Sequence, residues 1–209
     1  MSVPVKIICL LINLAIVVCE AVGLTASFRE IGVKTLQYYT TDSNILAAVA
    51  ALAMCIGLAV SLVTGRDVSR TLRMCDYFAA CTVGLTFIIV LFVLAPMDKE
   101  GLAVGLRNSF VTGSIKYVHL ICPLLSAASV IACGITKGLP FSVAVLALIP
   151  TLLYAAVVIP LNIARVMVGP YGFLHIYEQP PLASVMWFFL IPAIAFGISS
   201  GLWKLGALL

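Results

Sequence analysis

The sequence predicts an all-α membrane protein, a bundle of six transmembrane helices, several of them kinked by proline. Of its 209 residues, 63% are hydrophobic and only 10% are charged, which excludes a soluble domain of this size. The apolar residues come in runs of about 20, the length of a membrane-spanning helix. These runs are apolar on all faces, whereas β-barrel strands alternate apolar and polar residues. They cover approximately residues 5–25, 43–64, 75–95, 115–135, 141–164 and 183–205.

The first run has features of a signal peptide, because Lys6 precedes a long apolar stretch. The stretch is longer than a typical signal-peptide core and ends without a clear small-x-small cleavage site. We therefore expect a retained first helix. Since the longest connections between runs have roughly twenty residues, we predict one transmembrane domain over residues 1–209, with its function in the bundle and at its rims.

An even number of spans places both termini on one side of the membrane, here called side A, and the opposite side is side B. Arg66, Arg70 and Arg73 cluster in a short side-A loop. Positive residues accumulate in short cytoplasmic loops, so this cluster predicts cytoplasmic termini. The net charge of +4 is modest and spread over both rims, which argues against a nucleic-acid partner.

Polar residues gather toward side B at the ends of several runs. An ionisable group inside a membrane is expensive and indicates function, and small molecules bind between helices of bundles. His119, about one turn into the fourth run, is the most informative of them. The gathered residues are Glu20, Thr40, Thr41, Asp42, Asn44, Lys116, His119, Asn162, Arg165 and, in the loop before the last run, Tyr171.

Proline should bend the fourth run beside His119. Pro123 has no N–H to donate to the carbonyl of His119, four residues earlier, and its ring presses against that carbonyl. We therefore expect a bend and a free acceptor next to the imidazole. Pro150, Pro160 and Pro192 should break other runs in the same way, with neighbouring helices or water satisfying the freed groups.

Each polar residue also has a purely structural interpretation. Thr40, Thr41, Asp42 and Ser43 are good helix N-caps, and His119 could hydrogen-bond across a helix interface. Lys116 and Arg165 could extend to lipid headgroups, and Glu20 could pair with one of these cations. The seven cysteines form no CxxC pair and no Cys/His cluster with metal-ligand spacing, so we predict neither a metal site nor a cofactor.

Three short motifs resemble one family. The stretch from Tyr38 to Ile45 (YYTTDSNI) resembles the YFTxxSN opening of the second helix in bacterial six-helix integral membrane proteins. The run from His119 to Pro123 resembles that family's HxxxP motif, and the segment beginning at Tyr171 (YGFL) resembles its YPFL loop. These bacterial proteins are related to the eukaryotic androgen-induced-gene and androgen-dependent TFPI-regulating proteins (FAR-17a-like).

The resemblance implies an intramembrane hydrolase that cleaves fatty acid esters of hydroxy fatty acids with a threonine and a histidine. The matching positions here are Thr40 and His119, and the resemblance implies a bacterial inner membrane. Thr41 occupies a position that is usually not threonine, so the choice between Thr40 and Thr41 stays open. Gly172 stands where the family commonly has proline, and His175 where it commonly has an acidic residue.

The chemistry fits these residue types. A threonine hydroxyl becomes a nucleophile when a base removes its proton, and histidine is the usual base near neutral pH. Thr41, Asp42, Asn44, Lys116, Asn162, Arg165, Tyr171 and Glu20 are candidates to support the site or bind substrate. Lys116 or Arg165 could bind the carboxylate of a lipid ester. The alternatives are a non-catalytic lipid-binding membrane protein and a small proton-coupled transporter.

Overall fold

A computed structural model describes residues 1–208, and in this part of the chain helices are the only regular elements. Five helical segments are long and apolar enough to cross a membrane, and Tyr117–Ala132 forms a shorter apolar helix. The chain is therefore a multi-pass helical membrane protein. The α-helices are α1 (Val3–Ile31), α2 (Tyr39–Thr64), α3 (Arg70–Ile89), α4 (Leu102–Phe110), α5 (Cys122–Ala132), α6 (Ser142–Leu146), α7 (Ile149–Ile163) and α8 (Pro181–Ala207).

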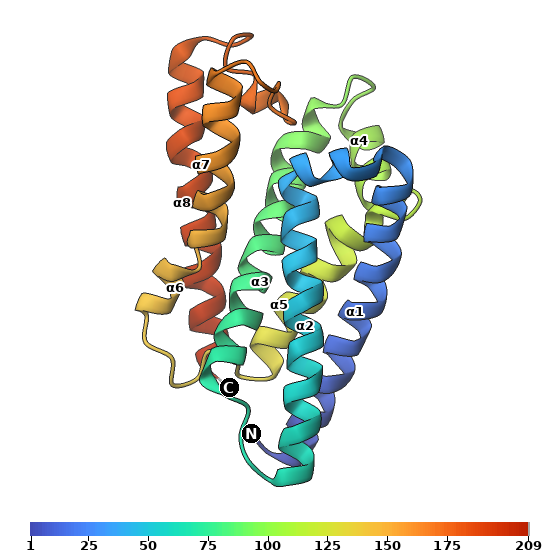
Figure 1. Ribbon diagram of the computed structural model, residues 1–209, viewed down its shortest axis with the longest axis vertical. Coiled ribbons are helices and arrows are strands. Elements are labelled where there is room, and N and C mark those ends of the chain that lie inside the picture. The colour runs from blue at the N-terminus through green and yellow to red at the C-terminus, as the bar shows by residue number, and fades with distance from the viewer. Residues whose placement is uncertain (209) are drawn as a thin grey trace.

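Four helices form a closed unit in which α1 packs on α2, α2 on α3, α3 on α5 and α5 on α1. Figure 1 shows α7 and α8 side by side next to this unit, with α8 contacting α3 and α5. Both termini lie at the end opposite α4. Side A is therefore the end with the termini, and side B the end with α4 and the start of α2.

Several helix boundaries differ from the sequence-based ones. The second helix begins at Tyr39 rather than near residue 43, so Thr40 to Ser43 lie inside the helix and are not its N-cap, which is Tyr38. The fifth run is divided into α6 and α7, and Pro150 lies in the first turn of α7, where its missing N–H has no helical partner to lose. The connection expected over residues 96–114 contains α4, where Gly105 lies so close to Ala95 that a Cβ would meet its carbonyl oxygen at 2.1 Å.

Two wide helical turns precede prolines. In η2 (Val90–Leu94) and η4 (Tyr117–Ile121) the backbone is π-helical, and the residue before the proline donates five residues back, from Ala95 to Val90 and from Cys122 to Tyr117. Pro96 and Pro123 follow directly and cannot donate. The π-turn is thus how the chain accommodates Pro123 beside His119. Such turns are frequent at functional sites.

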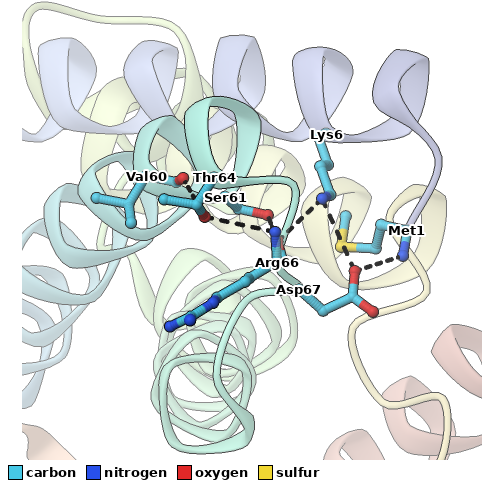
Figure 2. A network of polar contacts seen from close by, with 7 residues as sticks. All are labelled: Met1, Lys6, Val60, Ser61, Thr64, Arg66 and Asp67. Atoms are coloured by element: carbon cyan, nitrogen blue, oxygen red, sulfur yellow. Dashed lines mark hydrogen bonds and ion pairs between the residues drawn. The ribbon is translucent and has the colours of Figure 1, made fainter.

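At side A, the two ends of the α1–α2 hairpin are joined by polar contacts (Figure 2). The N-terminal ammonium of Met1 donates to Asp67 Oδ1 at 2.9 Å, and the Nζ of Lys6 lies 3.8 Å from the same oxygen. Lys6 also donates to the backbone oxygen of Arg66 at 3.1 Å, and Ser61 donates to that oxygen as well. These contacts tie α1 to the loop after α2.

Candidate functional site

The first turn of α2 carries the best-placed candidate nucleophile. The Thr40 N–H donates to the hydroxyl of Tyr171 at 3.1 Å, and the Thr40 hydroxyl lies 3.3 Å from the same oxygen. A side chain from the loop before α8 thus does the work of the N-cap that the sequence had assigned to Thr40–Ser43. Tyr38, the N-cap residue, makes no capping hydrogen bond with its side chain, and the Tyr171 hydroxyl supplies the acceptor instead.

Thr40 and Thr41 have different surroundings. Thr41 is buried, and its Oγ1 lies 2.7 Å from the Oγ1 of Thr35, so that hydroxyl is engaged in packing α2 against the preceding 3-10 turn η1 (Gly32–Gln37). Thr40 is half-buried, and among residues 1–208 its hydroxyl has a hydrogen-bond contact with the Tyr171 hydroxyl alone. Of the two neighbours, Thr40 has the freer hydroxyl.

Asn44 connects the Thr40 turn to the helix that carries His119. Its Nδ2 donates to the Thr40 carbonyl at 2.6 Å and to the Val118 carbonyl at 3.3 Å. The side chain is fully buried, and its Oδ1 has no hydrogen-bond partner in the described part of the chain. One buried amide therefore fixes the start of α2 against η4, and a polar atom at the same place remains unsatisfied.

His119 lies in the π-turn η4, one residue after the carbonyl that Asn44 binds. Its ring lies beside the backbone of Ser109 in α4, and its Nδ1 is buried without a hydrogen-bond partner among the residues that the structure describes. Among the hydrogen bonds of residues 1–208, none joins Thr40 to His119. The structure thus brings the two segments together through Asn44 and leaves the imidazole nitrogen unpaired.

Tyr171 belongs to a compact aromatic group in the loop between α7 and α8. Its ring stacks on Phe173 at 5.2 Å and meets Tyr38 edge-on at 5.9 Å. Burial raises the pKa of the Tyr171 hydroxyl above its usual value, and the hydrogen bonds with Thr40 only partly oppose this. The hydroxyl therefore stays protonated and available to donate toward Thr40 Oγ1.

The remaining predicted residues divide into two groups. Asn162 and Arg165 border a hollow of about 290 Å³ at the side-B end of α7, together with His175 and Glu178. Asn162 donates to the Leu174 carbonyl, and the Arg165 guanidinium lies 4.4 Å from the centre of the Tyr177 ring. Asn162 thereby ties α7 to the loop that delivers Tyr171.

The other group stays close to α1, α2 and η4. Asp42 is half-buried in the first turn of α2, and the Nζ of Lys116 lies 5.6 Å from the centre of the neighbouring Tyr117 ring. Glu20 is fully buried, and neither of its oxygens has a hydrogen-bond partner among residues 1–208, so the pairing with a cation that was its structural interpretation is absent there. No three His, Cys, Asp or Glu side chains of residues 1–208 lie together as a metal site.

Sequence reasoning missed the contacts that assemble the site. The pairing of Tyr171 with Thr40 spans 131 positions, and the Val118 carbonyl is a backbone group that no residue type announces. The sequence analysis also did not predict a buried polar cluster near side A, formed by Asn13, Asp76 and Ser129. Lys6, Asn13 and Glu20 recur every seven residues along the first run. That spacing, which keeps residues on one helix face, was the available signal.

Comparison with known proteins adds no relative. The chain matches no family model, no curated protein and no solved structure. Its function is therefore argued from its own residues and geometry.

Proposed function

We propose that this protein is an intramembrane lipid hydrolase that cleaves fatty acyl esters, with Thr40 as nucleophile and His119 as general base. The supporting observation is the meeting of three segments far apart in the sequence. Tyr171 contacts Thr40, and Asn44 of the same turn binds the carbonyl next to His119. These are the segments whose motifs resemble the FAR-17a-like family of intramembrane threonine hydrolases.

The proposed reaction has two steps. In the first, His119 takes the Thr40 proton while Oγ1 attacks the acyl carbonyl, and the alcohol leaves with that proton. In the second, water deprotonated by His119 attacks the acyl-threonine and frees the fatty acid and the hydroxyl. The Thr40–His119 hydrogen bond would form when substrate enters, since such bonds are often long or absent in ligand-free enzymes.

Tyr171 and the start of α2 would stabilise the oxyanion. The first N–H groups of a helix have no partner within the helix, and they attract negative charge. The Tyr171 hydroxyl already occupies this position and would donate to the oxyanion once substrate displaces it from the Thr40 N–H. Arg165 or Lys116 would bind a substrate carboxylate at the side-B rim.

We also propose six membrane crossings, with the kinks at proline, in a bacterial inner membrane and with cytoplasmic termini. Five long helices alone would leave the termini on opposite sides, whereas both lie at one end of the bundle (Figure 1). The shorter helix Tyr117–Ala132 would supply the sixth crossing. The cytoplasmic side would be side A, which carries Arg66, Arg70 and Arg73.

The test is hydrolysis of a long-chain fluorogenic fatty acyl ester by the purified protein, with labelling by a fluorophosphonate probe. Thr40→Ala and His119→Ala should each lower turnover by about 10²-fold or more. The matched control is Thr64→Ala at the side-A end of the same helix, where the hydroxyl donates to the Val60 carbonyl and accepts from the Arg66 N–H, far from Thr40. Hydrolysis and labelling that persist in both site variants would refute the assignment, and a co-purified lipid without turnover would favour a non-catalytic lipid-binding protein.

A further inference from the structure

The end of α7 and the loop that leads to α8 border a hollow of about 290 Å³ at side B. Two hydrogen bonds hold its walls together. Asn162 donates to the Leu174 carbonyl, and the Tyr177 hydroxyl donates to the Ile163 carbonyl at 2.7 Å. Gly169 lets the walls approach closely, because a Cβ there would lie 2.4 Å from Leu174 Cβ. The hollow is therefore fixed by hydrogen bonds and close packing.

Arg165 borders this hollow with a backbone conformation that glycine usually adopts. Its φ is 57°, and among residues 1–208 it is the one residue other than glycine with a positive φ. Its N–H donates to the Asn162 carbonyl, and the next N–H donates to the Leu161 carbonyl, both at 2.9 Å. This hydrogen-bond pattern ends many helices, with glycine common at the left-handed residue. An arginine there costs stability, and residues kept in such conformations cluster at functional sites.

The Arg165 guanidinium is held in place while its hydrogen-bond donors stay free. It lies 4.4 Å from the centre of the Tyr177 ring, and within residues 1–208 it has no hydrogen-bond or ion-pair partner. Tyr177 is itself fixed to the end of α7 by its hydroxyl. A guanidinium that lies over an aromatic ring can still donate from its edge, where two parallel N–H groups match the oxygens of a phosphate or a carboxylate. This arrangement favours an anion.

The other titratable groups at the hollow, His175 and Glu178, pair with each other. His175 Nδ1 lies 3.0 Å from Glu178 Oε2, so this carboxylate is already engaged with the imidazole. The second ring nitrogen, Nε2, has no partner among residues 1–208 and remains for a ligand. Among the residues that line the hollow, Arg165 therefore carries the one charge without a counter-charge.

Apolar residues adjoin these polar groups. Val168 and Ile176 line the hollow, and Val166 and Val168 are exposed over 71% and 67% of their surface. The hollow lies between the apolar segment that ends at Ile163 and the one that begins at Pro181, in the loop at the side-B end of Figure 1. This position is the level of lipid headgroups, just outside the hydrocarbon core. A ligand that fits both parts of the hollow carries an anionic group on an apolar body.

We propose that this hollow binds the phosphate group of a membrane phospholipid. Arg165 would donate two N–H groups to phosphate oxygens, and His175, when protonated, would donate from Nε2. The apolar wall would contact the glycerol and the upper acyl chains. One bound lipid would thus join the end of α7 to the loop that carries Tyr171. The site is independent of the proposed hydrolysis, in which Lys116 remains the alternative cation for a substrate carboxylate.

The experiment measures lipid binding to the detergent-purified protein by native mass spectrometry, with dioleoyl phosphatidylglycerol as the probe. Dioleoylglycerol, which has the same acyl chains and no phosphate, should bind wild type about tenfold more weakly. Arg165→Gln should weaken binding of phosphatidylglycerol by about tenfold or more, since it removes a charged hydrogen-bond donor. The matched control is Arg107→Gln, which removes an exposed cation of α4 on the same side that does not line the hollow. It should bind the lipid as wild type does.

Inorganic phosphate distinguishes the two sources of this anion. At the same concentration as the lipid it should leave the lipid bound, because it cannot contact the apolar wall, and displacement would mean that the hollow takes free phosphate instead.

Arg165→Gly removes the side chain and relieves the positive φ. In lipid-free detergent it should melt no lower than wild type, and it should lose the lipid as Arg165→Gln does. Equal lipid binding by wild type and Arg165→Gln would overturn the proposal. A lower melting temperature for Arg165→Gly would overturn it as well, because the arginine would then serve the fold.

Discussion

The α1–α2 hairpin carries polar groups both at its side-A end and at its side-B end. The two groups differ in whether their polar atoms have hydrogen-bond or ion-pair partners. At side A, Met1, Lys6 and Asp67 form a network in which each charged group has a partner, and Asp67 is exposed to solvent (Figure 2). At side B, the buried atoms Asn44 Oδ1 and His119 Nδ1 have none. Buried polar groups in folded proteins are nearly always paired. The side-A network therefore joins α1 to the loop after α2, whereas the unpaired atoms at side B are those to which the proposed function assigns a ligand or a proton.

The largest effect on stability is expected from Asn44→Ala. It removes a buried amide that joins two helices, leaves the Val118 carbonyl without that donor and opens a small cavity, so about 1–3 kcal/mol of unfolding free energy should be lost. The comparison at side A is Ser61→Ala, which removes a contact between α2 and its own following loop. Unfolding in mixed micelles, followed by circular dichroism, should rank Asn44→Ala as the more harmful, and the reverse order would break the contrast between the ends.

Two glycines offer a matched pair. A Cβ on Gly23 would lie 2.6 Å from Val118 Cγ1, and a Cβ on Gly57 would lie 2.6 Å from Leu72 Cδ1. Val118 is buried, and β-branched side chains are stiff, whereas the end of the leucine side chain can move. Gly23→Ala should therefore cost about 1–3 kcal/mol and displace the turn that carries His119, and Gly57→Ala should cost less.

Both glycine variants are measured in the same unfolding assay and for hydrolytic turnover. Only Gly23→Ala should lower turnover in the fraction that remains folded. Equal losses in the two variants would mean that η4 is no more rigidly placed than the side-A half of the bundle.

Tyr171→Phe tests the proposed oxyanion donor with little disturbance of packing. The ring stack on Phe173 is kept, and only the hydroxyl beside Thr40 is removed. Turnover should fall about tenfold, the worth of one hydrogen bond made in the transition state, with a nearly unchanged KM. Tyr177→Phe is the control in the same loop, because its hydroxyl donates to the Ile163 carbonyl away from Thr40. Equal turnover in wild type and Tyr171→Phe would remove Tyr171 from the proposed mechanism.

The smallest effect is expected at side A. The hydrogen bond and charge of the N-terminal ammonium lower the pKa of Asp67 below its ordinary value of 3.8. A carboxyl group with a lowered pKa in the folded protein stabilises it above the ordinary pKa, and this contribution disappears as the pH falls through the lowered value. Asp67→Asn should thus lower the melting temperature slightly at pH 7 and low salt, and the difference from wild type should vanish at acid pH or high salt. A difference that persists in high salt would contradict an exposed ion pair.

The sequence predicts the long helices well because their signal is local. Runs of apolar residues near Val3–Ile31 or Pro181–Ala207 need no knowledge of their neighbours. The start of α2 was misplaced because the acceptor for its first N–H groups is the hydroxyl of Tyr171, a side chain distant along the chain. The division of α6 from α7 and the presence of α4 depend on packing against other helices. The hydropathy of the sequence does not predict this packing.

For the candidate site, residue types were predicted and contacts were not. Thr40, Asn44 and Tyr171 were all named from the sequence and do lie together. The free acceptor expected beside Pro123 follows from the chemistry of proline, but whether the helix bends or widens there depends on the helices around it. The structural interpretation of Glu20 paired it with a cation, but it lies beside the thiol of Cys122 because α5 packs on α1.

The π-turn before Pro123 sets the rotational phase of a whole helix. An α-helix turns by about 100° per residue, so one extra residue in a turn rotates everything beyond it by that angle relative to what precedes it. In this chain η4 presents His119 beside α4, and the following α5 directs Cys122, Ser126 and Ser129 to the interior. Removing a single residue from Tyr117–Ile121 would leave the hydropathy of the segment almost unchanged and turn one of these two faces away from the other. The width of one helical turn thus keeps the imidazole and the polar row of α5 in register.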